Sequence, residues 1–322
     1  MTTPILQTNA LSKTFGGGRR LFGGTKPAVH AVSEVSLSVA PGKTLGIVGE
    51  SGCGKSTLAR MLVGLLPPSA GTIRLAGHDL AQAAREGPRV FAQTIQYVFQ
   101  DPAAALNPRK TIRQIIEAPL VHLARMGAQA RAARVAEVMA AVGLREDFLE
   151  RHPHAFSGGQ AQRIGIARAL AAAPRILVLD EPVSALDVSI QAQVLALLAD
   201  LRARLSLTYL FISHDLAVVE TIADEVAVMY FGRVVETGPV DAVFASPRHP
   251  YTRLLLDSAP SLGRRAPARI ATAGELPDPT RPPPGCPFAP RCPRARDACR
   301  EAMPPLVSSG PGRTVACIDP IV

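Results

Sequence analysis

The sequence predicts an α/β fold built around a phosphate-binding loop, and three observations support this fold class. The motif GESGCGKST at 49–57 fits the pattern G-x-x-x-x-G-K-[ST]. A fully apolar segment, ILVL at 176–179, is followed directly by the acids Asp180 and Glu181. The intervening sequence has the apolar spacing of helices. We therefore expect an α/β phosphate-loop core with an antiparallel β subdomain, an inserted helical subdomain over about 105–172 and a Pro/Cys-rich C-terminal extension.

Composition limits the classes of function. The chain has 322 residues and a net charge of +9, which suits a nucleic acid, an anionic membrane surface or a polyphosphate equally well. Aromatic residues make up 4% and Trp is absent, which argues against a protein that stacks on nucleic-acid bases. No apolar run is long enough to span a bilayer, and the N-terminal sequence lacks the pattern of a signal peptide. We expect a cytoplasmic protein whose cysteines are thiols or metal ligands.

Residues 4–48 predict the antiparallel β subdomain. Ile5, Leu6 and Leu11 precede a Gly-rich basic loop at 16–27. Val32, Val35, Leu37 and Val39 follow it, and the last three alternate with period 2. Phe15, just before the loop, could stack on a purine ring. An ordinary strand-end aromatic is an equal alternative for Phe15, and Phe22 is a second candidate for stacking.

The phosphate loop lies between a predicted strand at 44–48 and a predicted helix that includes 58–62. Its glycines let consecutive backbone N–H groups point into one concavity, where the helix dipole adds positive potential. Lys55 is expected to reach the β- and γ-phosphates of a nucleotide, and the Ser56 hydroxyl is expected to bind Mg²⁺. The nucleotide ligands predicted from this loop are Gly49, Ser51, Gly52, Gly54, Lys55, Ser56 and Thr57. Cys53 is expected to be a small residue in a tight turn.

Further strands are expected at 72–75 and 95–99, the second ending at Gln100. The helical subdomain is indicated by apolar residues at helical spacing: Ile112, Ile115, Ile116, Val135, Val138, Met139 and Val142. Ser157 is placed to cap a helix at 161–173 that ends before Pro174. Together with the two glycines after it, this cap forms a second anion site.

The strand at 176–179 delivers two acids at its C-terminal end, where Mg²⁺ chemistry beside a phosphate loop needs them. The sequence SALD at 184–187 leads into a helix at 189–204. A strand at 209–213 ends at His214, and another follows at 226–230.

The order and spacing of these motifs resemble the ATP-binding-cassette (ABC) ATPases, and the resemblance covers residues 4–258. It adds FSGGQ at 156–160 as the family's signature, with Phe156 where the family usually has leucine. The resemblance implies hydrolysis of ATP with Mg²⁺ by head-to-tail dimers. The residues to which the resemblance assigns roles in ATP hydrolysis are Lys55, Gln100, Glu181 (general base) and His214 (γ-phosphate contact). The further ligands that it implies are Gln100 and Asp180 for Mg²⁺, and Ser157, Gly158, Gly159, Gln160 and Asp187 for ATP of the opposite subunit.

Three segments narrow the resemblance to the ATPase subunits of oligopeptide and dipeptide importers, of the second (F-type) kind: VFQDPAAALNPR at 98–109, HPYTRLLL at 249–256 and PPPGCPFAPRCP at 282–293. The implied partners are a paralogous ATPase subunit, two transmembrane permease subunits and, indirectly, an extracytoplasmic binding protein. The implied location is the cytoplasmic face of the inner membrane. Nickel or glutathione is an alternative cargo. An ATPase acting on nucleic acid or ribosomes is less favoured, because the chain has one cassette and no sustained heptads.

The extension at 259–322 holds 14 of the 29 prolines, so little regular secondary structure is expected there. It also holds four of the five cysteines, which are Cys286, Cys292, Cys299 and Cys317. In a cytosolic chain, four cysteines in 32 residues suggest metal ligation. The resemblance favours a [4Fe–4S] cluster; zinc and unligated thiols are the alternatives.

Overall fold

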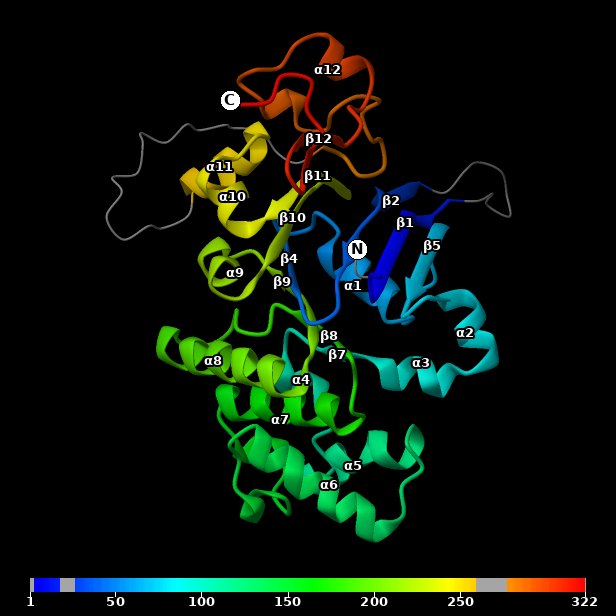
Figure 1. The fold of residues 1–322 in the computed structure, drawn as a ribbon, viewed down its shortest axis with the longest axis vertical. Coiled ribbons are helices and arrows are strands. Elements are labelled where there is room, and N and C mark those ends of the chain that lie inside the picture. The colour runs from blue at the N-terminus through cyan, green and yellow to red at the C-terminus, as the bar shows by residue number, and fades with distance from the viewer. Residues whose placement is uncertain (1–2, 18–26, 259–276, 322) are drawn as a thin grey trace. The chain divides into compact units, whose positions relative to one another are not determined.

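The computed structural model describes residues 3–17, 27–258 and 277–321 (Figure 1). The chain divides into two compact units. The first unit comprises residues 1–6, 39–44 and 74–212, and the second comprises residues 7–38, 45–73 and 213–322. The two units are therefore each assembled from several separate stretches of chain. The predicted domain boundary between residues 258 and 259 was placed at a change in sequence composition and not by contacts in space, and it stays a prediction.

The first unit contains a parallel sheet and most of the helices. Its elements are β6 (His78–Asp79), α2 (Leu80–Glu86), α3 (Pro88–Thr94), β7 (Ile95–Val98), α4 (Pro102–Ala105), α5 (Ile112–His122), α6 (Ala128–Ala141), η1 (Glu146–Phe148), η2 (Pro153–Ala155), α7 (Gly158–Ala171), β8 (Ile176–Asp180), α8 (Val188–Leu205) and β9 (Thr208–Ser213).

Strand β8 is paired in parallel with β7 on one side and β9 on the other. Every residue of β8 is buried, which explains why its sequence is apolar without alternation. The three strands are in register, with Tyr97 opposite Val178 and Asp180 opposite Ile212. Polar residues that follow β7 and β8 therefore emerge at the same edge of the sheet, and this edge is the expected place for a site in a parallel α/β sheet.

The predicted helical subdomain is present as α5, α6 and α7, which lie side by side (Figure 1). Helix α5 begins with a capping box in which the Thr111 hydroxyl accepts from the Gln114 N–H and the Gln114 side chain accepts from the Thr111 N–H. The seven apolar residues that indicated these helices are all buried. Their burial between the helices supplies the main stabilisation of this subdomain.

The second unit contains the remaining strands and the C-terminal residues. Its elements are β1 (Leu6–Gly16), β2 (Ala28–Val35), β3 (Ser38–Val39), β4 (Thr44–Val48), α1 (Lys55–Leu62), β5 (Ala70–Leu75), α9 (Leu216–Ile222), β10 (Glu225–Tyr230), β11 (Arg233–Pro239), α10 (Val240–Ala245), α11 (Pro250–Ser258), η3 (Ala289–Arg291), α12 (Ala298–Glu301), β12 (Val307–Gly310) and β13 (Arg313–Val315).

The predicted antiparallel β subdomain is a sheet in the order β2-β1-β5-β6, with β3 also paired to β1. Strands β1 and β2 are antiparallel, and Leu11 lies opposite Val35. Both side chains are buried, and the alternation of apolar residues indicated this for Val35.

A second group of strands joins the phosphate loop to the end of the chain. Strand β4 is parallel to β10, β10 is antiparallel to β11, and β11 is antiparallel to β13, which forms a hairpin with β12. The C-terminal extension therefore adds β12 and β13 to the sheet that contains β4, the strand before the phosphate loop. The proline content of this segment predicted only sparse regular structure there. The described elements are indeed short, but their pairing with β11 was not predicted.

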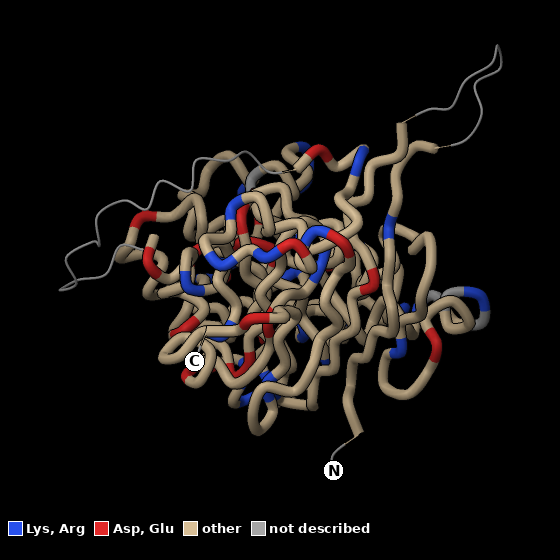
Figure 2. The backbone as a smooth tube through the Cα atoms, turned by 90° about the horizontal axis from the view of Figure 1, so that it is seen from above, with Lys and Arg blue, Asp and Glu red and all other residues tan. Residues whose placement is uncertain are grey.

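No helix in the described part of the chain is long and apolar enough to cross a membrane. Basic and acidic residues are interspersed along the backbone (Figure 2). In the extension, Arg294 and Arg296 both form ion pairs with Asp319, at 2.8 and 2.9 Å. Part of the positive charge of the extension is thereby neutralised locally.

Candidate functional site

The phosphate loop has the conformation that its glycines predict. Gly49 and Gly54 have φ angles of +153° and +104°, which side chains with a Cβ rarely adopt. A Cβ on Gly49 would also overlap the carbonyl oxygen of Met229, and one on Gly54 would overlap that of Ala31. These two positions therefore require glycine for both conformational and steric reasons.

Lys55 is the first residue of α1, and its side chain is buried against its own loop. Its Nζ donates hydrogen bonds to the carbonyl oxygens of Gly49 (2.7 Å) and Glu50 (2.9 Å). The ammonium therefore lies inside the concavity of the loop, where a polyphosphate would bind. Cys53 is buried in the same turn, and burial raises the pKa of its thiol. Ser51 and Gly52 are exposed, whereas Ser56 and Thr57 are half-buried.

Asp180 is the last residue of β8 and is buried. The Tyr97 hydroxyl, from the neighbouring strand β7, donates a hydrogen bond to Asp180 Oδ2. This contact orients a carboxylate at the edge of the parallel sheet. Tyr97 was not predicted as a site residue, although its place on the predicted strand that leads to Gln100, three residues before it, was a possible signal.

Glu181 follows Asp180 with a φ of +48°, a conformation that is uncommon for a residue other than glycine. Its N–H donates to the Ile212 carbonyl (2.9 Å), and its carbonyl accepts from the Ser184 hydroxyl (3.1 Å). The Gln100 amide nitrogen donates to Glu181 Oε2 at 2.9 Å. The structure therefore brings together two predicted hydrolysis residues that are 81 positions apart, and the local turn holds the carboxylate half-exposed.

The signature segment at 156–160 begins a helix, and Ser157 is its N-cap residue, as predicted. Ser157 caps α7: its hydroxyl accepts from the Gln160 N–H, and the Gln160 side chain accepts from the Ser157 N–H. Helix α7 begins at Gly158, three residues before the predicted start. A Cβ on Gly159 would lie 2.5 Å from a methyl group of Ile190, so close packing against α8 requires glycine here.

The remaining predicted site residues lie at the ends of elements. Asp187 is the N-cap residue of α8, and His214 follows β9; both are exposed. Phe15 is 40% exposed near the end of β1, with Lys13 Nζ 5.3 Å from its ring centre. Phe22 lies outside the described residues. The phosphate loop, Phe15 and His214 belong to the second unit, and the carboxylates, Gln100, the signature segment and Asp187 belong to the first.

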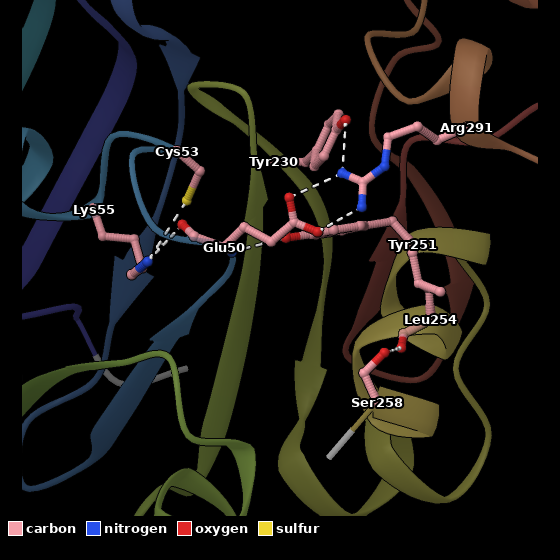
Figure 3. Close-up of polar contacts among 8 residues, drawn as sticks. All are labelled: Glu50, Cys53, Lys55, Tyr230, Tyr251, Leu254, Ser258 and Arg291. Carbon is pink, nitrogen blue, oxygen red and sulfur yellow. Dashed lines mark hydrogen bonds and ion pairs between the residues drawn. The ribbon is translucent and has the colours of Figure 1, made fainter. Parts of the chain in front are cut away.

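Residues that the sequence analysis did not single out surround Glu50, the second residue of the phosphate-loop motif (Figure 3). The Glu50 N–H donates to the Tyr251 hydroxyl (2.9 Å). The Arg291 guanidinium donates to both carboxylate oxygens of Glu50 at 2.9 Å. Tyr251 and Arg291 occur in two of the segments that carried the importer resemblance, HPYTRLLL and PPPGCPFAPRCP, but no sequence signal linked them to the loop.

The four cysteines of the extension line one small cavity, together with His249 and Phe288. All four are free thiols. Burial raises the pKa of Cys286 to about 11 and raises those of Cys292 and Cys317. Within residues 3–17, 27–258 and 277–321, no group of three or more His, Cys, Asp or Glu side chains could hold a single metal ion. The fit is therefore partial: the four thiols are gathered around one cavity, but they are not preformed as a compact one-ion site.

Comparisons with known proteins agree with this geometry. The family model described as "ABC transporter" matches residues 32–184, and the one described as "Oligopeptide/dipeptide transporter, C-terminal region" matches residues 235–299. The chain is 49% identical to the dipeptide transport ATP-binding protein DppF of Haemophilus influenzae, covering 98% of this chain and 96% of the relative. It is 47% identical to the oligopeptide transport ATP-binding protein AppF of Bacillus subtilis, covering 97% and 96%.

Solved structures give the same result for the fold. CbiO1 from Clostridium perfringens, part of the ABC transporter complex cbiONQ, matches with a TM-score of 0.64 and 29% identity, over 76% of this chain and 91% of that one. The ATP-binding cassette MJ0796, solved as a dimer in a post-hydrolysis state with ADP and Pi, matches with a TM-score of 0.64 and 28% identity, over 73% and 98%. The predicted α/β phosphate-loop fold is therefore confirmed.

Proposed function

The chain belongs to the ATP-binding subunits of ABC transporters, in the group of oligopeptide and dipeptide importers, and from this we propose that it hydrolyses ATP to power peptide import through a membrane permease. The peptide cargo is supported by the names of relatives that are 46–51% identical over nearly the whole chain. The same degree of similarity makes an ATPase acting on nucleic acid or ribosomes less favoured. Nickel or glutathione remains an alternative cargo, because the extracytoplasmic binding protein selects what is carried.

The ATP-binding roles are divided between the two units. In the second unit, the loop N–H groups and Lys55 would bind the phosphates, and the Ser56 hydroxyl would bind Mg²⁺. In the first unit, Asp180 and the side-chain oxygen of Gln100 would bind Mg²⁺, since this ion prefers oxygen ligands. When bound, Mg²⁺ neutralises charge that develops on the transferred phosphoryl group.

The observation that supports hydrolysis most directly is the Gln100–Glu181 hydrogen bond at 2.9 Å. A general base must be oriented toward the attacking water, and the Gln100 amide fixes one carboxylate oxygen so that the other can accept the water's proton. His214 would donate a hydrogen bond to the γ-phosphate. A half-exposed carboxylate with a fixed orientation suits this role better than a mobile surface acid.

The proposed working form is a head-to-tail dimer with a paralogous ATPase subunit. Ser157, Gly158, Gly159, Gln160 and Asp187 would contact ATP held by the opposite subunit. Two permease subunits complete the assembly, which places the chain peripherally on the cytoplasmic face of the inner membrane. ATP binding would close the dimer, and hydrolysis would open it.

The test of the base assignment is the Glu181→Gln variant, purified together with its partner subunit. We expect ATP binding to be retained and steady-state hydrolysis to be abolished, because an amide cannot accept the water's proton. The matched control is Glu220→Gln, which changes an exposed glutamate on α9 and should leave turnover unchanged. Unchanged turnover in Glu181→Gln would remove the base assignment.

The proposal extends to the cysteine extension, which would hold a [4Fe–4S] cluster on Cys286, Cys292, Cys299 and Cys317. Four sulfurs around one zinc ion lie within about 4 Å of one another, given Zn–S bonds of about 2.3 Å. The four thiols line one cavity without forming such a compact set, and Cys286, Cys292, Cys299 and Cys317 would supply the four thiolate ligands of a cluster. Ligation would require the thiolates, so metal binding would release protons that burial otherwise retains.

Anaerobic purification with metal analysis and a visible spectrum tests this assignment. About four irons and four sulfides per chain, with broad brown absorbance, would support the cluster. One zinc per chain would make the extension a structural zinc site and would refute the cluster. The absence of both metals would refute metal ligation by these cysteines and leave the ATPase proposal standing.

A further inference from the structure

Glu50 links the C-terminal extension to the phosphate loop. Its two carboxylate oxygens each accept a hydrogen bond at 2.9 Å from the guanidinium of Arg291, a residue 241 positions away. The side chains of this pair are 11% (Arg291) and 28% (Glu50) exposed. A two-bond contact of this kind fixes direction as well as distance, and partial burial protects it from solvent screening.

The backbone of Glu50 is fixed as well (Figure 3). Its N–H donates to Tyr251, and its carbonyl oxygen accepts from Lys55 Nζ. Every polar group of Glu50 therefore has a partner, and two of these partners come from residues far along the chain. Since the same residue contacts both Arg291 and Lys55, a shift of Glu50 would move the atoms that hold the lysine.

Arg291 itself contacts a group of packed aromatic side chains. Its guanidinium lies 5.8 Å from the ring centres of both Tyr230 and Phe288, and Nη1 is 3.3 Å from the Tyr230 hydroxyl. It ends the 3₁₀ turn η3, which lies between Cys286 and Cys292. Successive turn hydrogen bonds, from Ala289 N–H to Cys286 and from Cys292 N–H to Ala289, fix the position of this segment.

We propose that Arg291 is a positioning residue for the phosphate loop, which holds Glu50 so that the loop keeps the conformation that binds nucleotide. Nucleotide affinity then depends on the folded C-terminal extension, although no residue of the extension is required to touch the nucleotide. The proposal rests on nucleotide binding at Lys55, which is part of the proposed function.

The direct test compares the dissociation constant for a fluorescent ATP analogue with Mg²⁺ in the full chain and in Arg291→Met. Methionine keeps the apolar part of the side chain but cannot donate hydrogen bonds to the Glu50 carboxylate. We expect the dissociation constant to rise about tenfold, while turnover at saturating ATP changes less than about twofold, because the reacting groups are untouched. Arg291→Lys keeps the charge but not the paired geometry and should restore part of the affinity.

The matched control is Arg300→Met in the same extension. Arg300 forms an ion pair with exposed Asp297 in its own helical turn, at 3.2 Å, so its replacement should leave nucleotide affinity unchanged. Glu50→Gln should weaken binding to a similar extent, and the Glu50→Gln/Arg291→Met double variant should bind no worse than the weaker single variant. Additive losses would show that the two residues act separately and would overturn the proposal.

A second measurement uses the unaltered chain and therefore does not depend on a variant folding. Because coupling between two sites is reciprocal, nucleotide should also stabilise the extension. Amide hydrogen exchange over 286–292 should slow when the ATP analogue and Mg²⁺ are added, and exchange that is unaffected by bound nucleotide would refute the coupling. If the unaltered chain bound no nucleotide, the proposed function itself would fail, whereas normal binding by Arg291→Met would refute only the positioning role.

Discussion

Replacing Arg313 should destabilise the protein more than replacing Arg313 and Glu236 together. Glu236 on β11 is fully buried and accepts three hydrogen bonds: from Arg313 (2.9 Å) and from the N–H groups of Arg248 (2.8 Å) and His249 (2.9 Å). Arg313→Met leaves this carboxylate buried without its counter-charge. Breaking a buried ion pair from one side costs about 3–5 kcal/mol, a large fraction of the total stability of about 5–15 kcal/mol.

The double variant Glu236→Gln/Arg313→Met removes the buried charge along with its partner. The glutamine oxygen can still accept from a backbone N–H, so we expect a loss of only about 1–3 kcal/mol. The assay is urea unfolding followed by circular dichroism, with Arg300→Met as an exposed control that should behave like the unaltered chain. An Arg313→Met variant as stable as the unaltered chain, or a double variant less stable than Arg313→Met, would refute the reasoning.

Three further changes test single features. Gly49→Ala should abolish nucleotide binding in a titration and lower the free energy of unfolding by about 2–4 kcal/mol, because the added methyl group would overlap the Met229 carbonyl. In the control Gly52→Ala the added methyl group has open space, so only about 1 kcal/mol should be lost, to backbone strain. Burial lowers the pKa of His249 from 6.5 to about 3, so the unfolded chain alone takes up this proton between those values. On account of this residue, the free energy of unfolding should decrease by about 1.4 kcal/mol for each unit by which the pH is lowered in this range. Between pH 7 and 4.5 the His249→Asn variant should therefore lose less stability than the unaltered chain, and an equal loss would contradict this reasoning. Thr111→Ala should lower the free energy of unfolding by about 1 kcal/mol without changing nucleotide affinity. Unchanged stability would show that the Thr111 cap of α5 does not stabilise the protein.

Features that depend on local sequence were predictable. The phosphate loop, the apolar strand that ends at Asp180 and the Ser157 cap each follow from a few neighbouring residues whose conformational preferences agree. The errors at these elements are small: α7 begins at Gly158 rather than Ala161, because the two glycines already belong to the first helical turn.

Features that depend on contacts between distant residues were not predictable. Nothing near Arg291 indicates that its partner is Glu50, and nothing near β13 indicates that it pairs with β11. Such contacts arise only once the elements have packed, and a short strand such as Arg313–Val315 has too few residues to show a period. The hydrogen bond from Tyr97 to Asp180 belongs to the same class, since it joins two parallel strands that are far apart in the sequence.

The Ser157–Gln160 capping box affects how easily the proposed dimer can close. Because both hydrogen bonds of the box are made within one chain, the signature segment keeps its conformation without help from the opposite subunit. Fixing the backbone of a flexible segment costs about 1–2 kcal/mol per residue, and a segment that was ordered only on contact would add this cost to every closure. Here each subunit orders the segment when it folds, so the entropic cost would not be added again when the proposed dimer closes. In the proposed dimer the cap would thus lower the cost of closure, since association does not have to wait for the segment to fold.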